Sequence, residues 1–214
     1  MRRTSPRSLG IALIVWAVGV PSQAGAEALI GEDALTEFVA EGQASWEVPG
    51  IAVAAIAGDH VVTVTRGNTR LDDGLPITAD TAFAIASTTK AMLAAGLAIL
   101  VDRDALAWDE PVTQYFPELE LADGYVTRQL RVIDLLTHST GIPSTDYWTF
   151  SLGMPMDAQI ARLDEVEPTA AYRQRFQYQN TMYEVAGELI ERLTGEPWHQ
   201  FLAKQLWQPL AMTN

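Results

Sequence analysis

The stretch from Phe83 to Val101 constrains the fold more than any other part of the chain, because its only charged residue is Lys90. From Ala91 to Val101 every residue is apolar or glycine. This pattern predicts a helix buried on every side rather than an amphipathic surface helix. A lysine in such a helix is costly, since removal from water disfavours its charged form. We therefore expect a core that surrounds this helix. The amine of Lys90 inside such a core would need a specific role.

Ser87 stands three residues before Lys90, so the two side chains would share one face of a helix. A hydroxyl beside a desolvated amine has the arrangement of an activated nucleophile. The alternative is that Ser87 caps the helix and Lys90 extends from its first turn into water. Ser-x-x-Lys is a short pattern that also arises by chance, although it occurs once in this chain.

The first 26 residues have the three parts of a secretory signal peptide. Three arginines precede an apolar core from Leu9 to Val20, and Ala24-Gly25-Ala26 follows as a small-residue cleavage site. This core is too short to span a bilayer comfortably. We predict a signal peptide over 1–26, with cleavage after Ala24 or an uncleaved anchor as the alternatives. The mature protein is expected to be periplasmic or secreted, without stable membrane insertion.

The net charge argues against nucleic-acid partners. The chain has 14 basic and 27 acidic residues, and three of the basic ones lie in 1–26, so the remainder carries 11 against 27, or −16. Such a charge repels nucleic acid and anionic membranes. The absence of cysteine excludes disulfides, thiolate metal sites and a lipidated cysteine. His60, His138 and His199 show no ligand spacing, and no glycine-rich phosphate loop is present, so neither a metal nor a cofactor is expected.

The pattern along the chain predicts one β-hairpin followed mainly by helices. A helix over 33–43 precedes two β-branched runs, 51–57 and 60–65, which a Gly-Asp turn separates. A lone hairpin is marginally stable, so this sheet looks as if it lacks partner strands. Further helices are predicted at 131–137, at 157–163, from Asn180 to Gly195 and after Pro197. The segment 143–175 is otherwise irregular, which is typical of a functional wall or lid.

Tyr178-Gln179-Asn180 lies at the junction of a loop and the helix that begins near Asn180. A phenol there can share a proton with a neutral amine, and an amide two residues later points the same way if the backbone is extended. The alternative is a packing tyrosine followed by an asparagine N-cap.

Four segments together resemble successive blocks of the serine β-lactamase-related family, which includes class C β-lactamases, D-alanyl-D-alanine carboxypeptidases, D-aminopeptidases and esterases. The resemblance runs from about residue 34 to the end of the chain. It implies an α+β fold of the β-lactamase/DD-peptidase type, with a mostly helical region beside an antiparallel sheet, in a domain over 27–214. The four segments are Asp80–Lys90, Leu135–Gly141, Tyr178–Asn180 and Leu206–Met212.

The resemblance also implies a mechanism and a substrate class. Ser87 would attack a carbonyl to give an acyl-enzyme that water hydrolyses, with the Ser87 N–H as half of an oxyanion hole. Lys90 and Tyr178 would together act as general base and general acid, and either could take the proton. Asn180 would orient the substrate amide and Lys90. The substrate would be a small molecule or peptide: a β-lactam, a D-alanyl peptide or a small ester. The oligomeric state is left open.

The chain departs from the family at its third motif, Lys or His, then Thr or Ser, then Gly, which is absent from this sequence. In the family that motif lies on a later strand, which supplies the second oxyanion N–H and binds the substrate carboxylate. We therefore expect the N-terminal part of a larger enzyme, with an incomplete sheet. Little hydrolysis is expected from 27–214, because one oxyanion donor is worth roughly 10²–10³ in rate. The alternative is a non-catalytic penicillin- or peptidoglycan-binding protein, a sensor, or a decayed gene fragment.

Overall fold

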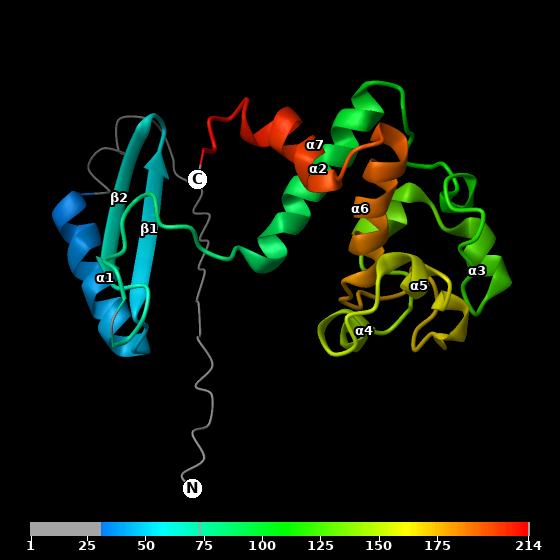
Figure 1. Cartoon of the computed structure of the whole chain (residues 1–214), viewed down its shortest axis with the longest axis horizontal. Coiled ribbons are helices and arrows are strands. Elements are labelled where there is room, and N and C mark those ends of the chain that lie inside the picture. The colour runs from blue at the N-terminus through cyan, green and yellow to red at the C-terminus, as the bar shows by residue number, and fades with distance from the viewer. Residues whose placement is uncertain (1–30, 73, 214) are drawn as a thin grey trace, which may run out of the picture. The chain divides into compact units, whose positions relative to one another are not determined.

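The computed structural model describes residues 31–72 and 74–213. The predicted signal peptide lies outside these residues, and the prediction of one domain over 27–214 stays a prediction. The chain folds as two compact units, one up to Ile85 and one from Ala86 to Thr213 (Figure 1). None of the helices in the described ranges has the length and apolarity needed to cross a membrane.

In chain order, the α-helices and strands are α1 (Glu32–Trp46), β1 (Gly50–Ala57), β2 (His60–Gly67), α2 (Thr89–Asp102), α3 (Gly124–Gln129), α4 (Asp146–Phe150), α5 (Met156–Ile160), α6 (Thr181–Thr194) and α7 (Trp198–Leu202). The 3₁₀ segments are Ala86–Thr88, Val112–Gln114, Val132–Leu136 and Leu163–Glu165, and a π-helical turn over Ala203–Trp207 follows α7.

In the first unit, α1 packs on one face of the β1–β2 hairpin. The two strands pair antiparallel along their whole length. Because side chains alternate between the faces of a strand, Val62 and Val64 of β2 are buried against Val39 of α1, and Ile51 and Val53 of β1 join them. The helix and hairpin predicted from the sequence are confirmed.

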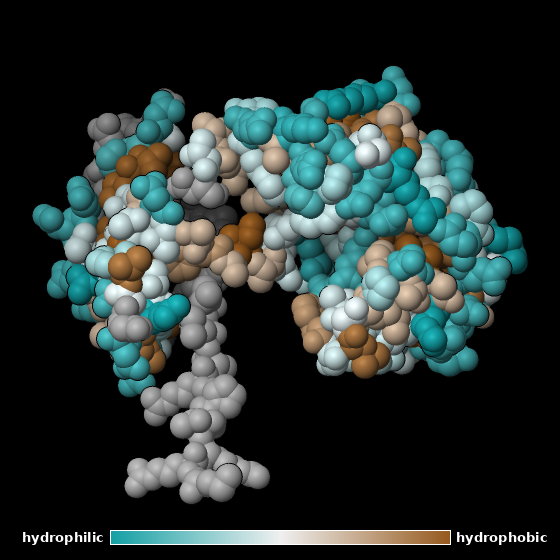
Figure 2. All heavy atoms as spheres, viewed as in Figure 1, coloured by the Kyte–Doolittle hydropathy of each residue, from teal (hydrophilic) through white to brown (hydrophobic). Residues whose placement is uncertain are grey.

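The opposite face of the hairpin is open in the first unit. Ile56 and Val61 point to this side and are largely exposed. Figure 2 shows hydrophobic side chains gathered over the hairpin. In the described residues the sheet has these two strands, so the antiparallel sheet expected beside the helices is present as a single hairpin.

In the second unit, α2 packs on α6 and α7 through one face. Its buried residues recur at helical spacing: Leu93, Gly96, Leu97 and Leu100. The prediction that this helix is buried on every side is wrong, because α6 and α7 reach one side of it and its other apolar residues stay partly exposed. The apolar run therefore makes a core helix with one accessible side.

The amphipathic helix predicted after Asn180 is confirmed as α6. It buries Met182, Val185, Ala186, Leu189 and Ile190, and it ends where Gly195 takes a left-handed conformation with φ of 72°. The predicted helix after Pro197 is confirmed as α7.

The shorter predicted elements differ from those observed. The helix predicted at 131–137 is a 3₁₀ segment over Val132–Leu136, and the one predicted at 157–163 is α5 followed by a separate 3₁₀ turn. Neither α3 nor α4 was predicted. Helices of five or six residues make fewer than two turns, so they show little periodicity in the sequence.

Gly141 closes the block 135–141, and an alanine at this position should destabilise the protein. Gly141 has φ of +85°, and a Cβ there would lie 2.1 Å from the backbone oxygen of Ala170. The left-handed conformation costs a residue with a Cβ about 1–2 kcal/mol. The clash with a backbone atom should add ~1–3 kcal/mol, as overpacking does elsewhere. Urea denaturation measures the loss.

Gly153→Ala is the matched control. Gly153 also has a positive φ, +60°, but a Cβ there meets no atom within 4 Å. Gly153→Ala should therefore show the conformational cost alone. Equal losses in the two variants would mean that the 169–170 segment moves aside without cost.

Candidate active site

Ser87 lies in the 3₁₀ turn just before α2 and is exposed to solvent. The residue before it, Ala86, has φ of 45°, a strained conformation for a residue with a Cβ. The N-cap position of α2 belongs to Thr88, so the alternative that Ser87 caps this helix is wrong. The Ser87 Oγ instead lies 2.6 Å from the Tyr178 hydroxyl and accepts a hydrogen bond from Lys90 Nζ at 3.3 Å.

Lys90 is half-buried in the first turn of α2, and its amine faces other site residues. Besides Ser87, it donates to Asn180 Oδ1 at 2.5 Å. The amine also lies 5.0 Å and 5.2 Å from the ring centroids of Tyr178 and Tyr183, within cation–π range. The alternative that Lys90 extends into water is therefore wrong.

Tyr178 is 91 residues from Ser87 in the chain, and its hydroxyl is hydrogen-bonded to it. Burial by itself would raise the pKa of Tyr178, but hydrogen bonds with Lys90 and Ser87 and the charge of Lys90 together lower this pKa below its ordinary value. The phenol of Tyr178 therefore ionises at a lower pH than that of a free tyrosine.

Asn180 occupies the N-cap position of α6, but its side chain makes no capping hydrogen bond. Its Oδ1 accepts from Lys90, and its Nδ2 donates to Asp146 Oδ1 at 2.9 Å. An ionised carboxylate can only accept, so Asp146 fixes the amide with its oxygen toward the amine. The structure thus brings together all four residues predicted from the sequence, Ser87, Lys90, Tyr178 and Asn180.

Sequence reasoning missed the residues that hold these four in place. Gln179 is completely buried, and its side chain donates to Thr140 Oγ1 at 3.0 Å and accepts from the Met182 N–H at 3.2 Å. It thereby anchors the Tyr178–Asn180 segment to the start of α6. Its place between two predicted site residues was a usable signal, because the middle residue of a triplet in the extended conformation assumed from the sequence would point the other way. No pattern in the sequence pointed to Asp146.

A pocket of about 580 Å³ opens beside Ser87 and Lys90. One part of its wall is apolar, with Leu93, Phe150, Met156 and Trp198. Another part carries Glu184, Glu188 and Glu191 of α6. Burial raises the pKa of Glu184, even though a hydrogen bond from the Thr149 hydroxyl opposes the shift. The pocket has the size of a small-molecule site and contains the proposed nucleophile.

Comparison with known proteins shows the family of the chain. Residues 35–214 match the protein family described as Beta-lactamase. The chain belongs to the β-lactamase family. It is 33% identical over 181 residues to the unguisins hydrolase ungD' of Aspergillus campestris (strain IBT 28561), covering 79% of this chain and 33% of that protein. It is 30% identical over 186 residues to the esterase EstB of Burkholderia gladioli, covering 78% of this chain and 46% of that protein.

A solved structure confirms the predicted fold for this family member. The octameric penicillin-binding protein homologue from Pyrococcus abyssi superimposes with a TM-score of 0.74 at 30% identity, covering 86% of this chain and 44% of that chain. The α+β fold of the β-lactamase and penicillin-binding type is thus present in part, as helices and a two-stranded antiparallel sheet. The chain spans about a third to a half of the length of these relatives.

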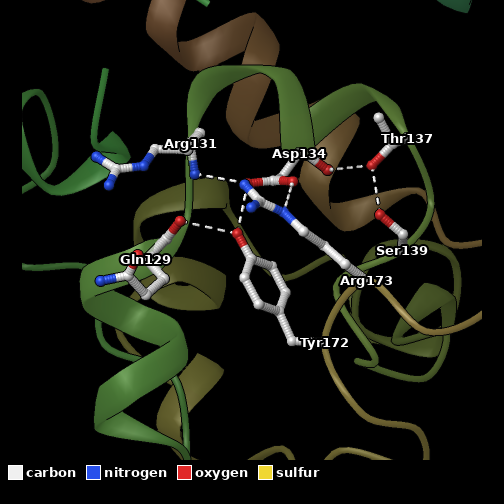
Figure 3. Close-up of polar contacts among 7 residues, drawn as sticks. All are labelled: Gln129, Arg131, Asp134, Thr137, Ser139, Tyr172 and Arg173. Carbon is white, nitrogen blue, oxygen red and sulfur yellow. Dashed lines mark hydrogen bonds and ion pairs between the residues drawn. The ribbon is translucent and has the colours of Figure 1, made fainter. Parts of the chain in front are cut away.

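A buried carboxylate, Asp134, ties the family block 135–141 to the segment that leads to Tyr178 (Figure 3). Asp134 is 3% exposed and accepts four hydrogen bonds: from Arg131 N at 2.7 Å, Tyr172 Oη at 2.5 Å, Arg173 Nε at 2.8 Å and Arg173 Nη2 at 2.7 Å. Burial raises the pKa of Tyr172, and its hydrogen bond to Asp134 adds to the shift, so the phenol stays a donor.

Within the described ranges, no group of three or more His, Cys, Asp or Glu side chains is arranged to hold a metal ion. His60 lies in β2, and His138 packs under Tyr178. The groups linked by hydrogen bonds to Ser87 or Lys90 here are an amine, a phenol and an amide.

Replacing Lys90 with methionine should raise the pKa of Tyr178. The change removes a hydrogen bond and a positive charge that lower this pKa, while the burial that raises it remains. The pKa should therefore move from below to above its ordinary value of about 10. Ultraviolet difference titration against Tyr178→Phe isolates this phenol from the other tyrosines. Lys204→Met is the matched control, because Lys204 pairs with Glu196 away from the site; an equal shift in that variant would contradict the assignment.

Proposed function

We propose that the chain is the nucleophile-bearing part of a serine hydrolase that cleaves an ester or an amide. One observation carries the proposal: the Ser87 Oγ is hydrogen-bonded to both Tyr178 Oη, at 2.6 Å, and Lys90 Nζ, at 3.3 Å. A hydroxyl in contact with two groups that can take its proton has the geometry of covalent catalysis. The family name and the esterase relative support amides and esters as the substrate class.

The proposed reaction proceeds through an acyl-enzyme. As Ser87 Oγ bonds to the carbonyl carbon, its proton passes to the amine of Lys90 or to the oxygen of Tyr178, whichever of the two is deprotonated. The same group then protonates the leaving alcohol or amine as its bond to the acyl carbon breaks. Water attacks the resulting ester and releases the acid. Asn180 orients Lys90 and the substrate, and the Ser87 N–H donates to the oxyanion.

We propose a β-lactam, a D-alanyl peptide or a small ester as the substrate, and a periplasmic or secreted location after removal of 1–26. Turnover by the chain itself is expected to be slow, because the family motif that supplies the second oxyanion donor is absent from this sequence. Loss of one such donor costs roughly 10²–10³ in rate.

The test is to map covalent labelling of purified 27–214. The chain is incubated with a fluorophosphonate and with a fluorescent penicillin, and labelled peptides are identified by mass spectrometry. We expect the label on the peptide that contains Ser87, and slow hydrolysis of a nitrophenyl ester or a chromogenic cephalosporin. A stable penicillin adduct without turnover would favour the non-catalytic binding alternative. Absence of label with every reagent would contradict the proposal, and fast hydrolysis would contradict the slow rate.

A further inference from the structure

His138 is a buried residue in a left-handed backbone conformation, just after the 3₁₀ turn that holds Asp134. Its φ is 55°, and its side chain is 9% exposed. This conformation is uncommon for residues other than glycine, although histidine and asparagine are enriched in it. Strained backbone conformations persist only where the surrounding structure imposes them, and they cluster at functional sites. We therefore looked for a function of His138.

The backbone on both sides of Tyr178 is hydrogen-bonded to His138. The Gln177 N–H donates to the His138 carbonyl oxygen at 2.6 Å. The Gln179 N–H donates to His138 Nδ1 at 3.3 Å. One residue thus holds the two neighbours of Tyr178, one through its backbone and one through its ring.

The imidazole also lies against the phenol ring. The ring centroids of His138 and Tyr178 are 4.4 Å apart, with the planes tilted by 30°. Tyr183 and Phe176 contact the same imidazole, with centroids at 5.1 Å and 5.3 Å. The phenol of Tyr178 is therefore supported by His138 along its ring and meets Ser87 at its hydroxyl.

The hydrogen bond from the Gln179 N–H needs a lone pair on His138 Nδ1, which only the neutral ring with its proton on Nε2 provides. Burial lowers the pKa of His138 and the charge of Lys90 lowers it further, whereas the contact with Gln179 opposes the shift. A neutral imidazole can act as acceptor and as packing surface at once.

We propose that His138 is a positioning residue that holds the Tyr178 phenol against Ser87, through its two backbone contacts and its ring. The inference rests on the proposed function, in which Tyr178 takes part in proton transfer. Misplacement of a catalytic group by about 1 Å can cost on the order of 10² in rate, so a support of this kind has a measurable effect.

Two substitutions separate the contacts. His138→Phe keeps an aromatic ring under Tyr178 but has no acceptor for the Gln179 N–H. His138→Asn keeps an acceptor near the Nδ1 position and tolerates positive φ, but has no ring. Each is made alone and together with Tyr178→Phe. The readouts are the rate of fluorophosphonate labelling at Ser87 and the pKa of Tyr178 from ultraviolet difference titration.

We expect His138→Phe to slow labelling by about 10- to 100-fold. It should also bring the pKa of Tyr178 back toward or above its ordinary value of about 10, since the phenol leaves Ser87 and Lys90. In the Tyr178→Phe background, the same substitution should slow labelling no further, because His138 acts through that phenol. His138→Asn should show a smaller change in both readouts.

Equal slowing with and without the Tyr178 hydroxyl would overturn the proposal, as would an unchanged pKa of Tyr178 in both His138 variants. Near-ultraviolet circular dichroism reports whether each variant is folded. If His138→Phe unfolds, His138→Asn alone decides by the same two criteria. Failure of the proposed function would look different, because the unchanged chain would then take no label at Ser87. The change in the pKa of Tyr178 between the unchanged chain and the His138 variants would still show whether His138 positions the phenol.

Discussion

Replacing Ser87 with alanine should abolish covalent labelling of the chain by a fluorophosphonate or a penicillin. The Oγ is the atom that both Lys90 and Tyr178 contact, and no other hydroxyl is shown in that position among the described residues. Removing the nucleophile of a serine hydrolase typically costs on the order of 10⁶ in turnover. Any slow hydrolysis by the unchanged chain should therefore fall to background in Ser87→Ala, as measured by intact-mass analysis and ester hydrolysis.

The loss should arise without unfolding. Ser87 is exposed, so its replacement should change the free energy of unfolding by no more than about 0.5 kcal/mol. Ser151→Ala, at an exposed serine that ends α4, is the matched control and should label like the unchanged chain. If Ser87→Ala were still labelled, another residue would be the nucleophile and the proposed mechanism would be contradicted.

The same site shows why parts of it were predictable from sequence. Ser87 and Lys90 are three residues apart, and Tyr178 and Asn180 are two apart, so each pair is visible as a local pattern. The contact between the pairs spans about ninety residues, and the resemblance to a family supplied it. The family prediction is confirmed for the fold, whereas the roles of these residues stay predictions.

Asp146 and His138, two of the supporting residues, were not predictable from the sequence, for a physical reason. Asp146 meets Asn180 across 34 residues, and His138 meets Gln179 across 41. His138 itself has a left-handed backbone conformation, as Arg173 has further along the chain. Local propensity does not forecast such conformations, because tertiary packing imposes them. Length decided which helices were predictable: α6 was predicted from its long apolar stripe, whereas α4 makes fewer than two turns and shows little periodicity.

Replacing Asp134 with alanine should cause the largest loss of stability of any single polar substitution considered for this chain. The buried carboxylate accepts from Tyr172, from Arg131 and twice from Arg173. Its removal leaves the Arg131 and Arg173 donors without this acceptor, whereas the Tyr172 hydroxyl keeps the Gln129 carbonyl oxygen at 2.8 Å. Breaking a buried pair by removal of one partner costs about 3–5 kcal/mol elsewhere. The Arg173 side chain is 48% exposed, so water can solvate part of it and the loss should lie near 3 kcal/mol.

Glu118→Ala tests whether burial is the cause. Glu118 also pairs with an arginine, Arg192, at 2.5 Å, but its side chain is 48% exposed. Exposed ion pairs contribute roughly 0–1 kcal/mol, so this variant should lose little stability in urea denaturation. If Asp134→Ala and Glu118→Ala lost equal stability, water would be accepting the hydrogen bonds of the Asp134 donors as readily as those of the Glu118 donor. The link between the 135–141 block and the Tyr172–Tyr178 segment would then have to rest on the backbone bonds of Ser139 and His138 instead.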